Sequence, residues 1–233
     1  MLEGHGLPLA VRDLVIAVPA GRSTARKILS ITRWDVPAGA RVALCGPSGS
    51  GKTSLLNILS AIARPAAGTV RWGAIDVTTF ASVVADRWRR TTIGIVFQHF
   101  HLFGGLSALE NVVIAARFDR FWLPSEIERH ARDLLDRVGV PARSRVEILS
   151  RGEMQRVAIA RALAHRPAIV LADEPTASLD RETADTATGL LVELCADARA
   201  TLVVATHDAT LASRMQDRFD ITRGEFADAS AAA

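Results

Sequence analysis

A glycine-rich run in the first quarter of the chain has the residue types that bind phosphate. It matches the pattern G-x-x-x-x-G-K-[ST], and a serine follows it. The residues are Gly46, Pro47, Ser48, Gly49, Ser50, Gly51, Lys52, Thr53 and Ser54. The glycines let backbone N–H groups close around phosphate oxygens, and the start of the following helix adds partial positive charge. A glycine-rich turn without a ligand is the alternative.

Two side chains of this run have specific chemistry to offer. Lys52 is a point charge for the β- and γ-phosphates of a nucleotide, and the Thr53 hydroxyl is a ligand for Mg²⁺. Only two of the 28 basic residues are lysines. A lysine at this position therefore indicates that a compact ammonium is needed where a guanidinium would not fit.

An apolar run that ends in two acids gives the second candidate. Residues 169–172 are apolar, and Asp173 and Glu174 follow them. Carboxylates at a strand end are costly to desolvate unless a positive group lies opposite, and Mg²⁺ is the obvious candidate. We expect Asp173 to hold the metal, directly or through water, and Glu174 to orient and polarise a water against the γ-phosphate. A plain surface pair of acids is the alternative.

Two further apolar runs end in single polar residues. Gln98 follows Phe97, and His207 follows Thr206. Ligands of open α/β sheets lie outside the carboxyl ends of the strands, so these residues are expected to face the same crevice as Asp173. Gln98 would then reach the metal or the water, and His207 would donate to the γ-phosphate. Taken alone, such a residue is more often an ordinary polar residue of a loop.

Short apolar runs predict the strands that position these groups. They cover residues 9–18, 41–45, 93–97, 168–172 and 202–206. The four later runs are apolar throughout, which is typical of parallel strands that are covered on both faces.

Helical patterns lie between the strands. Leu55, Leu56, Leu59 and Ile62 form one stripe, which Pro65 ends. A second helix is predicted over 125–138, opened by a capping box of Ser125 and Glu128 and closed by Gly139. Residues from about 99 to 165 have no strong strand signal, so they are interpreted as a helical insertion in the α/β core.

Length and composition exclude several classes of protein. With 233 residues, 49% of them hydrophobic, and a net charge of +3, the chain suits one large or two-lobed domain and is too apolar for disorder. Cys45 and Cys195 cannot make a disulfide framework or a zinc site, which favours a reducing compartment. We expect no signal peptide, no membrane span and, at this small net charge, no nucleic-acid partner.

The run LSRGEMQR at 149–156 completes a set of motifs with a specific order. Together with the glycine-rich loop, Gln98, the Asp173-Glu174 strand, the Ser178-Leu179-Asp180 run and His207, it resembles the ATP-binding cassette of ABC transporters over roughly residues 9–226. The segment IGIVFQHFHLFGGLSALENV is most similar to the stand-alone cassette subunits of the lipoprotein-release and macrolide-efflux type.

This resemblance implies a fold and a division of the chain. The expected fold is an α/β P-loop NTPase of the ABC ATPase type, with a mostly parallel sheet core, an N-terminal antiparallel β region and an inserted α-helical subdomain. One domain would span 1–233. Its nucleotide-binding core would cover 1–98 and 155–226, its helical subdomain about 99–154, and a disordered tail 227–233.

The resemblance also implies how such a subunit works. Two cassettes dimerise head to tail around ATP and Mg²⁺, so Ser150 and the Gly152 backbone would touch the γ-phosphate held by the other copy. Asp180 would lie near the partner's P-loop, and the loop after Gln98 would sense an integral membrane permease. The chain would thus be an ATPase at the cytoplasmic face of the inner membrane that powers export or lipoprotein extraction.

Other functions remain open at this point. A regulatory ABC ATPase could signal through a membrane partner without moving a solute. A soluble ABC ATPase acting on DNA or ribosomes is a further alternative, although those usually carry long coiled-coil insertions or a second cassette. The transported substrate, the direction of transport and the permease cannot be read from this subunit.

Two positions depart from the family pattern. Arg151 stands where the family usually has a glycine, and it would be strained if that position needed a positive φ. We expect it to be tolerated. The family also stacks adenine on an aromatic residue, whereas the matching position here is near Val18. The lost stacking would be partly recovered if Arg22 or Arg26 lay over the ring, and we expect weak discrimination among ATP, GTP and CTP.

Overall fold

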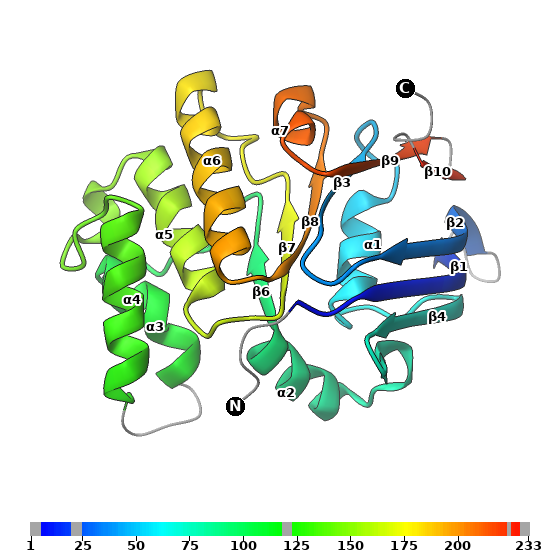
Figure 1. Cartoon of the computed structure of the whole chain (residues 1–233), viewed down its shortest axis with the longest axis horizontal. Coiled ribbons are helices and arrows are strands. Elements are labelled where there is room, and N and C mark those ends of the chain that lie inside the picture. Colours follow the sequence, from blue (N-terminus) through cyan, green and yellow to red (C-terminus); the bar gives the residue numbers. More distant parts are fainter. Residues whose placement is uncertain (1–5, 20–24, 118–122, 223–224, 229–233) are drawn as a thin grey trace.

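The structure is a computed structural model that describes residues 6–19, 25–117, 123–222 and 225–228. The described residues form a single mixed sheet of ten strands, in the order β5-β4-β1-β2-β10-β9-β3-β8-β7-β6. Figure 1 shows antiparallel strands at one side, parallel strands in the middle and a group of helices at the other side. The α/β class expected from the sequence is confirmed.

The candidate site lies at the carboxyl ends of strands in the parallel half of the sheet. Its strands are β3 (Arg41–Cys45), β6 (Ile93–Val96), β7 (Ile169–Asp173), β8 (Thr201–Thr206) and β9 (Asp217–Thr222). β8 lies between β3 and β7, and β6 forms the edge. Successive residues such as Ala43 and Leu44 enter two different apolar cores, one on each face, which explains why these strands are apolar throughout.

The apolar runs predicted only the first strand of the antiparallel half, a region that the family resemblance implied. Its strands are β1 (Leu9–Pro19), β2 (Ala25–Val36), β4 (Ala67–Trp72) and β5 (Ile75–Asp76). In β2, half-buried Ser30 separates buried Leu29 from buried Ile31, and the next two residues are exposed, so this strand has no continuous apolar run. β10 (Glu225–Asp228) joins the two halves by pairing with both β2 and β9, and it extends two residues into the expected C-terminal tail.

Helices cover both faces of the parallel strands. They are α1 (Lys52–Leu59), α2 (Ser82–Thr92), α3 (Ala108–Arg117), α4 (Ser125–Arg137), α5 (Arg151–Leu163), α6 (Arg181–Asp197) and α7 (Ala209–Ser213). Two short 3₁₀ helices cover Val77–Thr79 and Val146–Ile148. Side chains of α1 pack into the core beneath the antiparallel strands, whereas those of α3 to α6 form the core on the opposite face. No helix in the described ranges is long and apolar enough to cross a bilayer.

One predicted helix end and one predicted helix cap were wrong. α1 ends at Leu59, and Ile62 is 51% exposed because Ala61 already has a left-handed backbone. The predicted capping box at Ser125 does not form: α4 begins at Ser125 itself, after Pro124, and Glu128 pairs with Arg132 instead. The reciprocal bonds of a capping box are found at Ser150 and Glu153, at the start of α5.

Candidate nucleotide-binding site

The glycine-rich loop connects β3 to α1, as the sequence predicts. Gly51 precedes the first residue of α1 with a φ of 105°, a conformation that favours glycine. A Cβ atom there would lie only 2.9 Å from Cγ2 of Ile28 on β2, so glycine also permits close packing of the loop on the sheet. The N–H groups of Gly49, Lys52 and Thr53 have no acceptor within the described residues. The loop therefore presents free donors to an anion.

Lys52 lies at the centre of this loop and is 6% exposed. Its Nζ donates to the carbonyl oxygens of Gly46 and Pro47, at 2.7 and 3.1 Å. The same nitrogen is 3.5 Å from Oε1 of Glu174. In this arrangement the ammonium is already surrounded by oxygen atoms, and phosphate oxygens are chemically equivalent replacements for them.

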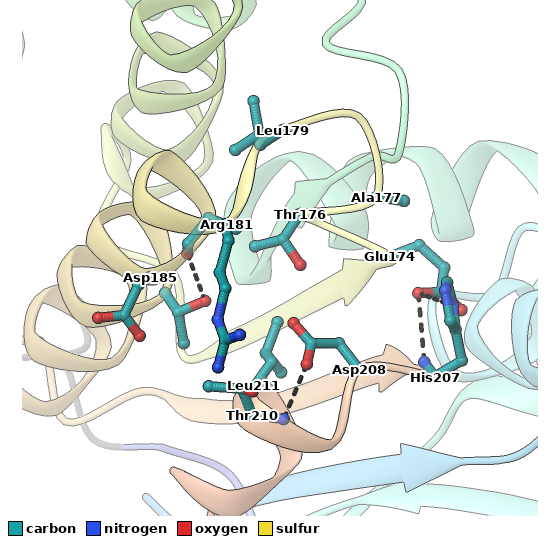
Figure 2. A pocket seen from close by; sticks show the side chains of 12 residues that line it. Glu174, Thr176, Ala177, Leu179, Arg181, Asp185, His207, Asp208, Thr210 and Leu211 are labelled. Atoms are coloured by element: carbon teal, nitrogen blue, oxygen red, sulfur yellow. Dashed lines mark hydrogen bonds and ion pairs between the residues drawn. The ribbon is translucent and has the colours of Figure 1, made fainter.

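Glu174 follows β7 and links Lys52 to His207. Its Oε2 is 2.9 Å from Nδ1 of His207 and also accepts the His207 backbone N–H at 3.3 Å (Figure 2). Its own N–H donates to the carbonyl of Ala205 at 2.8 Å. The backbone at Glu174 is left-handed, with a φ of 45°, which is uncommon for this residue type and typical of strained functional sites.

Asp173 is the last residue of β7, beside Glu174. Its Oδ1 is buried and accepts no hydrogen bond within the described residues. Burial raises the pKa of this carboxyl, while a hydrogen bond from Thr53 and the charge of Lys52 partly oppose the rise. An unsatisfied carboxylate oxygen next to a threonine hydroxyl is a donor set that suits Mg²⁺. Thr53 and Asp173 are therefore the residues that would hold this ion.

The described residues contain no group of three or more His, Cys, Asp or Glu side chains that could hold a metal by themselves. A magnesium ion at Asp173 would accordingly take most of its ligands from phosphate and water, as this ion commonly does. Gln98 lies two residues beyond β6, with an exposed side chain. It makes no hydrogen bond to Lys52, Asp173 or Glu174 in the described chain, so its expected role rests on the neighbouring position of β6 and β7.

The residues expected to act across a dimer gather away from the P-loop, at the starts of α5 and α6. Ser150 caps α5: its hydroxyl accepts the Glu153 N–H at 3.3 Å and donates to the Glu153 carboxylate at 2.7 Å. Asp180 caps α6 by accepting the N–H of Thr183 at 3.0 Å. A Cβ atom on Gly152 would overlap the methyl group of Thr183, so the two helix starts are in direct contact.

Arg151 is the first residue of α5 and is exposed. It is not among the residues with a positive φ, which here include Glu174 and His101. The backbone strain that an arginine would suffer in a left-handed conformation therefore does not arise.

A pocket of about 620 Å³ opens beside Glu174 and His207 (Figure 2). Thr176, Arg181 and Asp208 contribute to its walls, and α6 and α7 flank it. The sequence analysis missed these three residues. They lie next to predicted residues in the sequence, Thr176 and Arg181 after Glu174 and Asp180 and Asp208 after His207, but only the fold brings these two segments to one pocket.

The position that matches the adenine contact lies at the open end of the β1–β2 pair. Val18 is 38% exposed and pairs with Arg26 across the two strands. Arg26 precedes Ile28, the residue that touches the P-loop at Gly51. Arg22 lies outside the described residues. Trp34, the first aromatic residue of the chain, is buried against Phe219, with ring centroids 5.3 Å apart.

Comparison with known proteins decides the family. A sequence model of the ABC transporter family matches residues 29–177, more than half of the chain. The chain belongs to the ABC transporter family. The resemblance inferred from the motifs is confirmed, and the protein is an ABC-type ATPase subunit.

Relatives of this ABC cassette match it over most of its length. It is 41% identical over 221 residues to the lipoprotein-releasing system ATP-binding protein LolD 1 of Rhodopirellula baltica, covering 93% of this chain and 94% of that protein. It is also 41% identical to LolD of Hydrogenovibrio crunogenus, covering 83% and 84% of the two chains.

A solved structure of the family has the same fold. It is the dimeric post-hydrolysis state of the ATP-binding cassette MJ0796 bound to ADP and Pi. Its TM-score to this structure is 0.83, at 32% sequence identity, over 94% of this chain and 98% of that one.

Proposed function

We propose that this cassette hydrolyses ATP to power a membrane complex of the lipoprotein-release type, and that it does so as a head-to-tail homodimer. The contact series from Lys52 through Glu174 to His207 at the strand ends is the observation that carries the proposal. The LolD relatives support the choice of complex, because they match nearly the whole chain.

The site residues have distinct tasks in this reaction. Lys52 would exchange its carbonyl partners for phosphate oxygens. Glu174 would orient the attacking water and accept its proton, with His207 fixing the carboxylate on the other side. Bound Mg²⁺ would neutralise charge on the phosphates. Thr53, Asp173 and Gln98 are the residues we assign to holding it.

A second copy would complete the site. Ser150, Gly152 and Asp180 lie together at the starts of α5 and α6, with no hydrogen bond to their own P-loop in the described chain. A helix start with free N–H groups is a suitable contact for a γ-phosphate presented by a partner. Solved MJ0796 cassettes are dimeric, which supports this arrangement.

The permease would dock on the loop after Gln98, on the cytoplasmic face of the inner membrane. Phe103 and Ile148 are large apolar residues that remain 51% and 77% exposed. Their two segments are tied together, because Arg145 donates to the Gly105 carbonyl at 2.8 Å and Glu147 accepts the Gly105 N–H. Exposed apolar residues on a braced loop are typical of a protein contact.

Replacing the proposed base tests the function. Glu174→Gln keeps the side-chain shape but cannot accept a proton, so the variant should bind ATP and Mg²⁺, form a stable dimer and lose turnover by at least about 100-fold. ATP retention, sedimentation and phosphate release measure these three properties. Glu126→Gln, at an exposed position on α4, is the matched control. Persistent turnover in Glu174→Gln would contradict the assigned base, and a wild-type chain that binds no ATP would contradict the function.

A further inference from the structure

Arg161, near the end of α5, reaches across to the loop that follows Gln98. Its two terminal nitrogens donate to the carbonyl oxygens of His101 and Phe100, at 2.6 and 2.7 Å. The side chain is half-buried and has no carboxylate partner in the described part of the chain. Burial lowers the pKa of this guanidinium. Arg161 therefore gives up part of its hydration for bonds to two backbone carbonyls of this loop.

Two neighbouring contacts hold the same segment against the last turns of α5. A Cβ atom on Gly94 would overlap the carbonyl oxygen of Ala162, so β6 and α5 touch through their backbones. Nε2 of His165 is 3.1 Å from the carbonyl oxygen of Ile93. The segment from β6 to His101, which contains Gln98, is therefore held at both of its ends by α5 and the residues that directly follow it.

The other end of that helix is Ser150, which we propose to contact the partner's ATP. α5 has 13 residues, which corresponds to about 20 Å at 1.5 Å per residue. The capping box fixes its first turn, and buried apolar residues fix its middle. If contact with a nucleotide shifted the first turn, a helix of this length would carry the shift to Arg161 as one rigid element.

We infer that Arg161 is a positioning residue that couples Gln98 to α5, so that contact of Ser150 with a neighbour's nucleotide and placement of Gln98 at the metal change together. The inference rests on the proposed function. Arginine suits the task because its planar fork serves two adjacent carbonyls, whereas a lysine offers a single point charge. The left-handed backbone of His101, with a φ of 47°, marks the place where the loop turns toward Arg161.

The test compares the full-length wild type with Arg161→Met and Arg161→Lys. Arg129→Met, at an exposed site on α4, is the matched control. Amide hydrogen exchange is followed in residues 98–106 and, as an internal reference, in α1. Loss of two hydrogen bonds should speed exchange in 98–106 by about tenfold in Arg161→Met and by less in Arg161→Lys, with α1 unchanged. Arg129→Met should match the wild type.

A functional readout separates positioning from general stability. In Arg161→Met the Mg²⁺ concentration that gives half-maximal ATPase activity should rise about fivefold, while binding of a fluorescent ATP analogue in EDTA stays within about twofold of wild type. Wild-type exchange rates and Mg²⁺ dependence in a folded Arg161→Met would overturn the inference. If that variant does not fold, Arg161→Lys decides by the same two criteria.

The two proposals can fail separately. A wild-type chain that binds no ATP analogue would remove the proposed function, although the exchange measurement would still test whether Arg161 fixes the loop. ATP hydrolysis by wild type with unaltered exchange and Mg²⁺ dependence in the Arg161 variants would leave the proposed function standing and overturn the coupling.

Discussion

Asp173 shows how a site for a cation lowers the stability of the chain that carries it. Its carboxyl has a buried oxygen without a hydrogen-bond partner, and burial is the largest cause of its raised pKa. The folded chain therefore keeps this proton to a higher pH than the unfolded chain does. Folding becomes less favourable as the pH rises from the ordinary pKa of 3.8 through the raised value, and the cost is complete once the pH lies above that raised value.

Replacing Asp173 by asparagine should thus stabilise the protein and remove its activity. At pH 8 without nucleotide, we expect the melting temperature of Asp173→Asn to exceed that of wild type by about 2 °C, because solvent partly screens this charge. The difference should shrink at pH 4.5, and Mg²⁺-dependent hydrolysis should be lost. Thermal unfolding at both pH values measures this, with Asp136→Asn as control. A lower melting temperature at both pH values would contradict the argument.

The residues expected to lie beside the nucleobase determine how strongly the protein should discriminate among nucleotides. Val18 and Arg26 offer an aliphatic surface and a cation but no aromatic ring, so ATP, GTP and CTP should compete for the P-loop with affinities within about fivefold of one another. Val18→Tyr should tighten ATP binding by about tenfold through stacking. Competition against a fluorescent nucleotide measures both. A strong preference of wild type for ATP would show that another group reads the base.

At the scale of the elements, the close contact of α5 with α6 depends on glycine, which has no side chain, at position 152. Gly152→Ala places a methyl group against Cγ2 of Thr183 and should destabilise the protein by about 1–3 kcal/mol. Thr183→Ser removes that methyl but keeps the hydroxyl, so the double variant should regain most of the lost stability. Denaturant unfolding of the wild type, the two single variants and the double variant measures the coupling energy between the two substitutions. If the changes in free energy of unfolding were simply additive, the methyl group at position 152 would not be strained against Thr183, contrary to this prediction.

Sequence patterns predict the elements of the parallel half well, because residues 41–45 and 202–206 are buried on both faces and read as continuous apolar runs. Strands with one exposed face, such as β2, lack that signal. The pattern Ser-x-x-Glu occurs at both Ser125 and Ser150, but only the second lies just before its helix. The Arg161 contact was invisible, since it joins residues 60 positions apart.

At the scale of the whole molecule, each chain holds two halves of a site that do not meet. Lys52, Glu174 and His207 form one half, and the starts of α5 and α6 form the other. In the head-to-tail dimer that we propose, a symmetric pair of chains would join each half to its complement, so one two-fold interface would create two equivalent sites. Hydrolysis would then be a property of the proposed dimer and not of the single chain.

Mixing two inactive variants tests that claim most directly. Lys52→Met should disable the P-loop half and Ser150→Arg the helix half, so each protein alone should hydrolyse almost no ATP. Random pairing makes half of the dimers mixed, and each mixed dimer has one intact site, so an equimolar mixture should recover about a quarter of wild-type activity. Recovery of that size would support sites shared between chains. An inactive mixture in which sedimentation shows mixed dimers would contradict the account.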